Sequence, residues 1–312
     1  MALKVVILDY HGLMSPFYDI FESKELESIV SKDKPDAVLV WNDVLEMFQQ
    51  ICLVANRNGV PTFMIQHGRR AISDYLPGAD PQAKAIANVC FVWGEKDKEV
   101  AITAGWKPEM VFRVGAPWFR FLQKREPLQG RVVFDALHWD KEMPINYTLW
   151  NHLRKIEGIK PVAKLLQENH NIKKFTGEVM VTSMADPHGI EATIKLLSTC
   201  ECLVTVIEDT MTSLAYAMDI PVVFVKGLLT PQNLLGRKLD PSQFLPSDAC
   251  TTCNLEELEE TIKHVIEHPE EKRAERKQAT LDEAGDPETD HFISSIASIT
   301  TTICKSYGQQ GV

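Results

Sequence analysis

The alternation of short apolar runs with helix-like stretches limits what this chain can fold into more than any other feature. Continuous apolar or β-branched runs occupy residues 5–8, 37–41, 60–65, 89–93 and 110–114. Helical patterns over 17–32, 43–58 and 95–105 separate most of these runs. Unbroken apolar runs are typical of strands that are buried on both faces, and strands that alternate with helices build βαβ units around a parallel sheet. The first part of the chain is therefore predicted to be a doubly wound α/β domain.

The same pattern returns after residues 118–130, where it is interrupted. Strands are predicted at 131–135, 178–182, 202–206 and 220–225. Helices are predicted at 144–156, 160–169, 189–199, 210–218, 255–267, 269–281 and 288–305. A chain of 312 residues fits about two domains. We predict two tandem Rossmann-like domains, 1–125 and 126–312, the second with the closing C-terminal helices. Ligands bind beyond the carboxyl ends of parallel strands, so two such sheets facing each other would form a binding cleft.

The overall charge argues against a nucleic-acid partner. The formal net charge is -10, whereas nucleic acid and anionic membranes are bound by clustered Lys and Arg. A small anionic ligand in a local basic pocket remains compatible with this charge. The motifs G-x-G-x-x-G, G-x-x-x-x-G-K-[ST] and G-x-S-x-G are absent from the sequence, so dehydrogenase, P-loop NTPase and α/β-hydrolase functions lack their defining residues.

The cysteines are interpreted as reduced thiols of a cytoplasmic protein. Their number, seven, is odd, and several lie within apolar runs. Cys250 and Cys253 form one CxxC pair, and with His264 and His268 they leave a Cys2His2 zinc site as an alternative to helix-surface histidines. The first residues lack the apolar stretch of a signal peptide, and no apolar run is long enough to span a membrane. We therefore predict a cytoplasmic location without a transmembrane segment, and no metal site.

Polar residues follow the first and third strands of the first predicted domain. Asp9 and His11 come after the first strand, and His67, Arg69 and Arg70 come after the third. A histidine can act as a general base near neutral pH, and neighbouring guanidinium groups suit phosphate oxygens. A structural His-Gly turn is the alternative at residue 67.

The second domain has polar residues at the corresponding places. They are His138, Ser183, His188, Glu208, Asp209, Thr210, Thr212 and Ser213. The last four surround a predicted helix start, where free amides and the helix dipole attract phosphate. Asp209 and Thr212 could equally serve as helix caps.

Several of these segments, in this order, resemble GT-B proteins. The resemblance rests on Lys34-Pro-Asp36, Gly59-Val-Pro61 with Gln66-His67-Gly68, Val92-Trp-Gly94, Val114-Gly-Ala-Pro117, Asp186-Pro-His188 and the stretch from Ala215 to Pro221. It covers residues 34 to 300 and is strongest toward CDP-glycerol glycerophosphotransferases, surface-polysaccharide glycosyltransferases and UDP-N-acetylglucosamine 2-epimerases.

The resemblance implies a transferase that moves a sugar or glycerophosphate to a hydroxyl acceptor in cell-surface or polysaccharide biosynthesis. A UDP-, CDP- or GDP-linked donor would be held by the second domain, no further cofactor would be required, and a homo-oligomer is left open. His67, helped by Asp9 or His11, would be the catalytic base. Arg69 and Arg70 would hold the leaving diphosphate together with the helix start at residues 210–213, and Glu208 or Asp209 would hold the donor ribose.

The sequence departs from the family pattern at the donor pocket. Leu214 stands where these proteins usually have an acidic residue, and Asp209 and Thr210 replace a pair of small residues. An acid beside a diphosphate repels it. A UDP-sugar 2-epimerase and a non-catalytic binding or scaffold protein of the same fold therefore stay open as alternatives.

Overall fold

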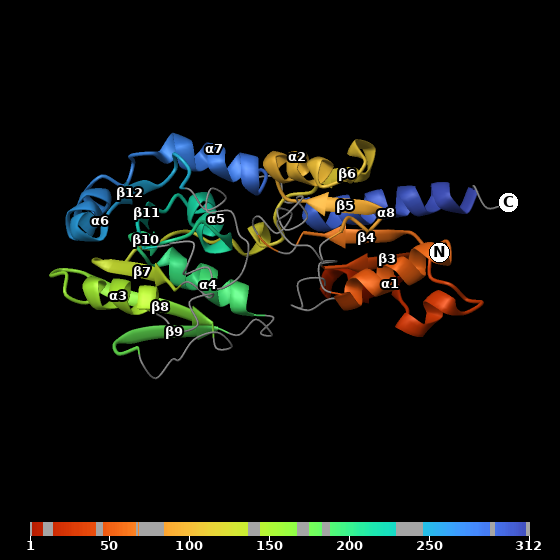
Figure 1. Ribbon diagram of the computed structural model, residues 1–312, viewed down its shortest axis with the longest axis horizontal. Coiled ribbons are helices and arrows are strands. Elements are labelled where there is room, and N and C mark those ends of the chain that lie inside the picture. Colours follow the sequence, from red (N-terminus) through yellow and green to blue (C-terminus); the bar gives the residue numbers. More distant parts are fainter. Residues whose placement is uncertain are drawn as a thin grey trace. The chain divides into compact units, whose positions relative to one another are not determined.

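The chain divides into two compact units, each built around one sheet. One unit takes Met1–Phe119 together with Leu281–Val312, and the other takes Arg120–Thr280. The computed structural model describes residues 2–8, 15–41, 46–66, 68, 84–136, 144–166, 175–182, 188–228, 246–287 and 291–309. Figure 1 shows the elements of both units along the chain.

The first unit has a six-stranded sheet in the order β2-β1-β3-β4-β5-β6, and every neighbouring pair is parallel. Its strands are β1 (Lys4–Leu8), β2 (Glu22–Ser23), β3 (Ala37–Val40), β4 (Thr62–Ile65), β5 (Val89–Val92) and β6 (Val111–Arg113). Its helices are α1 (Glu46–Arg57), α2 (Glu95–Thr103) and α8 (Phe292–Gln309), with the 3-10 turns η1 (Ser15–Asp19), η2 (Leu26–Val30) and η4 (Pro108–Met110). This is the doubly wound parallel sheet that the sequence predicts.

Successive residues of each strand enter two different cores, because side chains alternate across a sheet. One core joins Val5, Leu39 and Phe63 to α8 through Phe292 and Ile296. The other core, on the opposite face, joins the adjacent residues of these strands to α1 and α2 and is made by Val6, Val38, Met64, Cys52, Ala55 and Ala101. The C-terminal helix thus completes the first unit, whereas the sequence-based division placed it with the second.

The second unit has a six-stranded parallel sheet in the order β12-β11-β10-β7-β8-β9. Its strands are β7 (Arg131–Asp135), β8 (Lys160–Leu166), β9 (Glu178–Thr182), β10 (Cys202–Thr205), β11 (Val222–Val225) and β12 (Thr251–Cys253). The helices are α3 (Pro144–Leu153), α4 (Gly189–Ser198), α5 (Thr210–Ala217), α6 (Leu258–Glu267) and α7 (Arg273–Glu283), with η5 (Phe119–Phe121) and η9 (Leu255–Glu257) as 3-10 turns. One core packs α3 and α6 against the sheet through residues such as Phe134, Trp150, Val204, Leu258 and Ile262.

Two helix predictions are wrong. Residues 160–169 were expected to be helical, but β8 pairs with β7 on one side and β9 on the other. Residues 17–32 were expected to form one helix, but the Glu22 amide donates to the Leu3 carbonyl at 2.8 Å and starts the edge strand β2. In both places sheet pairing overrides the local helix preference of Ala, Leu, Lys and Glu.

Within the first unit, the backbone at Gly94 and Ala116 closely approaches residues 282–284, which belong to the same unit. A Cβ atom on Gly94 would lie 2.1 Å from the Asp282 carbonyl oxygen. The Ala116 amide donates to the Ala284 carbonyl at 2.8 Å in the same region. Only glycine permits this approach at residue 94.

Candidate functional site

The end of β4 is anchored by a buried glutamine, Gln66. The Gln66 side chain is fully buried. Its Oε1 accepts from the Trp93 amide at 2.8 Å, and its Nε2 donates to Asp97 Oδ2 at 2.8 Å and to the Gly68 carbonyl at 2.9 Å. The Trp93 indole N–H donates to the Gln66 carbonyl at 3.0 Å. Gln66 thus connects the end of β4 to the end of β5, to α2 and to Gly68. These contacts were not predicted from the sequence, which indicated only that polar residues follow the strand.

The predicted first-domain site residues themselves lie outside the described residues. These are Asp9, His11, His67, Arg69 and Arg70. Gln66 and Gly68, the neighbours of His67 in the chain, have the fixed positions given above. Because His67 itself lies outside the described residues, its catalytic role stays a prediction.

His188 is exposed at the start of α4 in the second unit. Its side chain is 81% exposed, and its Nδ1 lies 3.8 Å from Glu191 Oε2. It takes the N-cap position without a capping side-chain hydrogen bond. His138 and Ser183, which were predicted to bind the donor with it, lie outside the described residues.

The start of α5 is capped by its own side chains. Asp209 Oδ1 accepts from the Met211 amide at 2.8 Å, and Thr212 Oγ1 accepts from the Asp209 amide at 3.1 Å. Ser213 Oγ lies 3.5 Å from the Asp209 carbonyl. Thr212 and Ser213 are buried, and Thr210 is half-buried. The capping alternative is thus realised at this helix start, where the sequence predicts phosphate contacts.

A second carboxyl group lies beside this cap. Asp135 ends β7, which pairs with β10 directly before the Asp209 turn, and it is 4% exposed. Burial, followed by the charge of Asp209 and a side-chain hydrogen bond with it, holds the pKa of Asp135 well above its ordinary range, while Lys164 acts in the opposite direction. A protonated Asp135 can donate its proton to Asp209, so the two acids form a hydrogen-bonded pair at the carboxyl edge of the sheet.

Glu208 is the centre of a buried hydrogen-bond network. The side chain is 1% exposed, and its Oε1 accepts from the Tyr216 hydroxyl. The Ser247 hydroxyl donates to the same oxygen at 2.7 Å and the Ser247 amide at 3.1 Å. The Cys250 thiol donates to it at 3.2 Å. This network joins the β10–α5 turn to the segment before β12. The ribose contact of Glu208 stays a prediction.

The zinc alternative involving the CxxC pair is not assembled by the described residues. Cys250 contacts Glu208 and Tyr216, and Cys253 is buried. His264 Nε2 lies 2.9 Å from Glu271 Oε2. Within the described ranges, no cluster of three or more His, Cys, Asp or Glu side chains could hold a metal ion.

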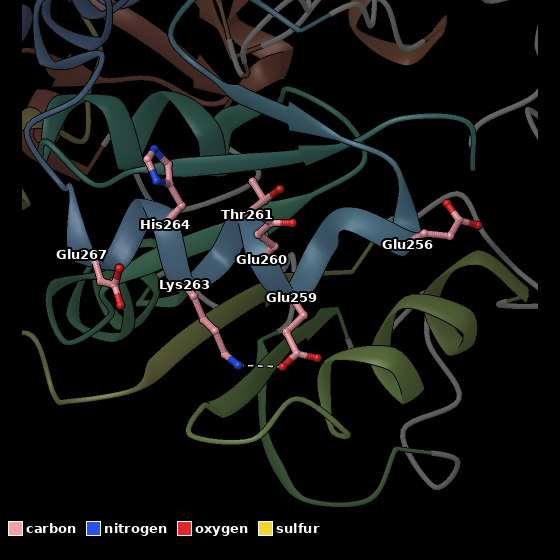
Figure 2. Close-up of a pocket in the computed structure, with 7 residues that line it drawn as sticks. All are labelled: Glu256, Glu259, Glu260, Thr261, Lys263, His264 and Glu267. Atoms are coloured by element: carbon pink, nitrogen blue, oxygen red, sulfur yellow. Dashed lines mark hydrogen bonds and ion pairs between the residues drawn. The ribbon is translucent and has the colours of Figure 1, made fainter.

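A shallow hollow of about 770 Å³ lies along α6 and η9 (Figure 2). Four glutamates line it, Glu256, Glu259, Glu260 and Glu267, with Thr261, Lys263 and His264. Lys263 Nζ is 2.6 Å from Glu259 Oε1, so the lysine that lines the hollow is already paired with a glutamate. This acidic surface is unsuited to a diphosphate.

The fold can be compared with proteins of known structure. No protein-family model matches the sequence, and no curated protein shows a significant match. Solved structures match almost the whole chain. The Anabaena protein HepE, in complex with UDP and glucose, has a TM-score of 0.56 at 10% identity, with 96% of this chain and 100% of that chain covered.

Two further solved structures have a similar fold. The UDP-GlcNAc 2-epimerase from Neisseria meningitidis, bound to UDP-GlcNAc, has a TM-score of 0.54 at 15% identity, covering 96% of this chain and 90% of that chain. The wall teichoic acid polymerase TagF has a TM-score of 0.60 at 11% identity, covering 99% and 90%. These similarities and the two all-parallel sheets confirm the predicted GT-B fold. Among the described residues, no helix is long and apolar enough to cross a membrane.

Proposed function

We propose that this protein is a GT-B transferase that moves a sugar or glycerophosphate from a nucleotide-diphosphate donor to a hydroxyl acceptor. The observation that carries the proposal is the match of nearly the whole chain to HepE in complex with UDP and glucose, and to TagF. Function is not inherited from a fold. The proposal therefore also rests on the polar residues at the carboxyl ends of β4, β7 and β10, where ligands bind in doubly wound sheets.

His67 is proposed as the base that removes the proton from the acceptor hydroxyl. A neutral imidazole has a suitable pKa for this step, and general-base catalysis contributes about 10²–10⁴-fold to the rate. The buried contacts of Gln66 support the assignment, because they fix both chain neighbours of residue 67 at the end of a strand. Asp9 and His11 are proposed to assist His67.

The leaving diphosphate is proposed to be bound by Arg69, Arg70 and the start of α5. Guanidinium groups and free helix amides both stabilise negative charge on phosphate oxygens. In the described structure, the Met211 amide is bonded to Asp209. Donor binding in this scheme therefore requires Asp209 to release that amide or to face away from the phosphates.

A non-catalytic binding protein of the same fold is the second candidate. It is favoured by the self-capped α5 and by the neighbouring Asp209, because the negative charge that raises the pKa of Asp135 also opposes a diphosphate. Glu208, the other candidate for the ribose contact, is committed to Tyr216, Ser247 and Cys250. This candidate predicts no turnover, whether or not a nucleotide binds.

A thermal-shift screen followed by a turnover assay separates the two candidates. The screen uses UDP, GDP, CDP, ADP, dTDP and their sugar conjugates, because a ligand that binds only the folded state raises the melting temperature. A transferase shows a shift with one nucleotide class and consumption of that donor, and His67→Ala lowers turnover by about 10²-fold or more without losing the shift. No shift with any nucleotide would contradict the transferase proposal. A shift without turnover, unchanged in His67→Ala, would favour the binding protein.

A further inference from the structure

A buried amide and a buried carboxyl group meet at the carboxyl end of β4. The Gln66 side chain is fully buried, and Asp97, in the first turn of α2, is 8% exposed. Gln66 Nε2 donates one hydrogen to Asp97 Oδ2 at 2.8 Å and the other to the Gly68 carbonyl at 2.9 Å. Figure 1 shows α2 next to β5 in the first unit. The contact with Asp97 thus connects this helix to the end of a neighbouring strand.

The hydrogen bonds fix which way the Gln66 amide faces. Its Oε1 accepts from the Trp93 backbone amide at 2.8 Å, whereas its Nε2 has the two acceptors described above. In the opposite orientation, the amide oxygen would face two acceptor oxygens and the NH2 group would face the Trp93 N–H. All three bonds would then be lost together. The Gly68 carbonyl is therefore bound in one arrangement of this amide only.

Helix stability alone does not explain why Asp97 is buried. An acid in the first turn of a helix interacts favourably with the helix dipole, and a surface position is sufficient for this. Glu95 lies in the same turn of α2, is exposed, and has its carboxylate 3.3 Å from Arg113. A buried carboxyl group costs free energy unless hydrogen bonds compensate for it. The bond to Gln66 supplies such compensation, at the edge of the sheet where ligands bind.

The network holds both chain neighbours of His67. The Gln66 carbonyl accepts from the Trp93 indole N–H at 3.0 Å, and the Gly68 carbonyl accepts from the Gln66 side chain. The Trp93 ring is itself buried and packs edge-on against Trp118, with the ring centroids 6.1 Å apart. A catalytic side chain needs support of this kind, because a misplacement of about 1 Å can lower the rate about 10²-fold.

We propose that Gln66 and Asp97 are positioning residues for His67. This inference rests on the proposed function, in which His67 is the base. Gln66 acts by holding the backbone at Gly68 and at its own carbonyl, and Asp97 acts by holding the Gln66 amide. Neither side chain contacts the substrate in this scheme, so both affect the rate through His67.

Two substitutions of Asp97 separate the loss of the bond from the loss of the acid. Asp97→Ala removes the acceptor and should lower kcat about tenfold or more. Asp97→Asn keeps an oxygen that can accept from Gln66 Nε2, so it should recover most of the lost kcat. Glu99→Ala is the matched control, because Glu99 is an exposed acid of the same helix, and its kcat should equal that of the wild type. The rates are measured well below the melting temperature of each variant.

A double-mutant cycle with His67→Ala distinguishes positioning from general stabilisation. Asp97→Ala should change kcat by less than about twofold when His67 is already alanine, because no imidazole is left to position. The proposal is overturned if Asp97→Ala lowers kcat by the same factor in both backgrounds, or if Asp97→Asn is as slow as Asp97→Ala. Gln66→Met, which has a similar volume, takes the place of Asp97→Ala in the cycle if that variant does not fold.

The ring signal of His67 in NMR spectra tests the positioning without turnover. The signal is identified by its loss in His67→Ala. It should shift in Asp97→Ala, return toward the wild-type position in Asp97→Asn, and stay unchanged in Glu99→Ala. A wild type that consumes no nucleotide sugar would refute the proposed function and leave this test in force. An unshifted signal in Asp97→Ala would refute the positioning role itself.

Discussion

Replacing Tyr216 by Phe removes one hydroxyl from the buried Glu208 network and changes little else. The Tyr216 ring is 2% exposed and stays in place, while its hydroxyl donates to Glu208 Oε1 and lies 2.9 Å from Cys250 Sγ. A hydrogen bond to a charged group contributes about 1.5–3 kcal/mol to stability. Glu208 keeps its bonds from Ser247 and Cys250, so we expect a loss of about 2 kcal/mol in the free energy of unfolding.

Urea unfolding followed by circular dichroism measures this loss. For a domain of this size, it corresponds to a melting temperature that is lower by about 4–8 °C. Tyr307→Phe is the control, because the same hydroxyl is removed from a residue of α8 that is 38% exposed, and it should change stability by less than about 0.5 kcal/mol. If Tyr216→Phe were as mild as this control, the network would not hold the β10–α5 turn to residues 247–250.

Three further perturbations test other parts of the account. Asp219→Ala should lower the free energy of unfolding in urea by about 3 kcal/mol, because it removes the carboxylate that binds the buried Arg276 guanidinium at 2.6 Å. Asp219→Asn should lower it by less, because asparagine tolerates the positive φ of 52° at this residue. Asp135 has a raised pKa in the folded state, so the folded chain binds that proton more tightly than the unfolded chain does. The stability of the wild type relative to Asp135→Asn should therefore be greatest at acid pH and fall as the pH rises through the folded-state pKa, and a constant difference between pH 4 and pH 8 would contradict the pairing. Gly94→Ala should cost at least about 2 kcal/mol, because its Cβ would meet the Asp282 backbone, and an unchanged melting curve would refute that contact.

Most of the strands that were predicted correctly are buried on both faces, whereas β9 was predicted although it is largely not buried. Residues 222–225 are apolar throughout and residues 202–206 are apolar except for Thr205, so their positions follow from that pattern alone. Residues 160–166 mix Lys, Pro, Ala and Leu, so only pairing with two neighbours makes them a strand. The strand β12 (Thr251–Cys253) is three residues long and too polar to give a periodic signal. Local pattern cannot encode such pairing.

The positions of the candidate site residues in the chain could be predicted from the sequence, but the residues that they contact could not. Asp209 and Thr212 were recognised at a helix start, and both prove to be caps. The partner of Asp209 was missed because Asp135 is distant in sequence and becomes a neighbour only through the β7–β10 pairing. The four bonds to Glu208 likewise come from α5 and from residues 247–250. Contacts of this kind depend on sheet order, which the sequence pattern leaves open.

Hydrogen–deuterium exchange of the full chain, with and without UDP-, CDP- and GDP-linked sugars, tests the central claim most directly. The claim is that the start of α5 in the second unit contacts a nucleotide-diphosphate donor. We expect one of these donors to slow the exchange of the backbone amides of residues 207–213, where bound phosphates would shield the helix start. Unchanged exchange at these amides with every donor, or protection confined to the first unit, would contradict the proposed donor site.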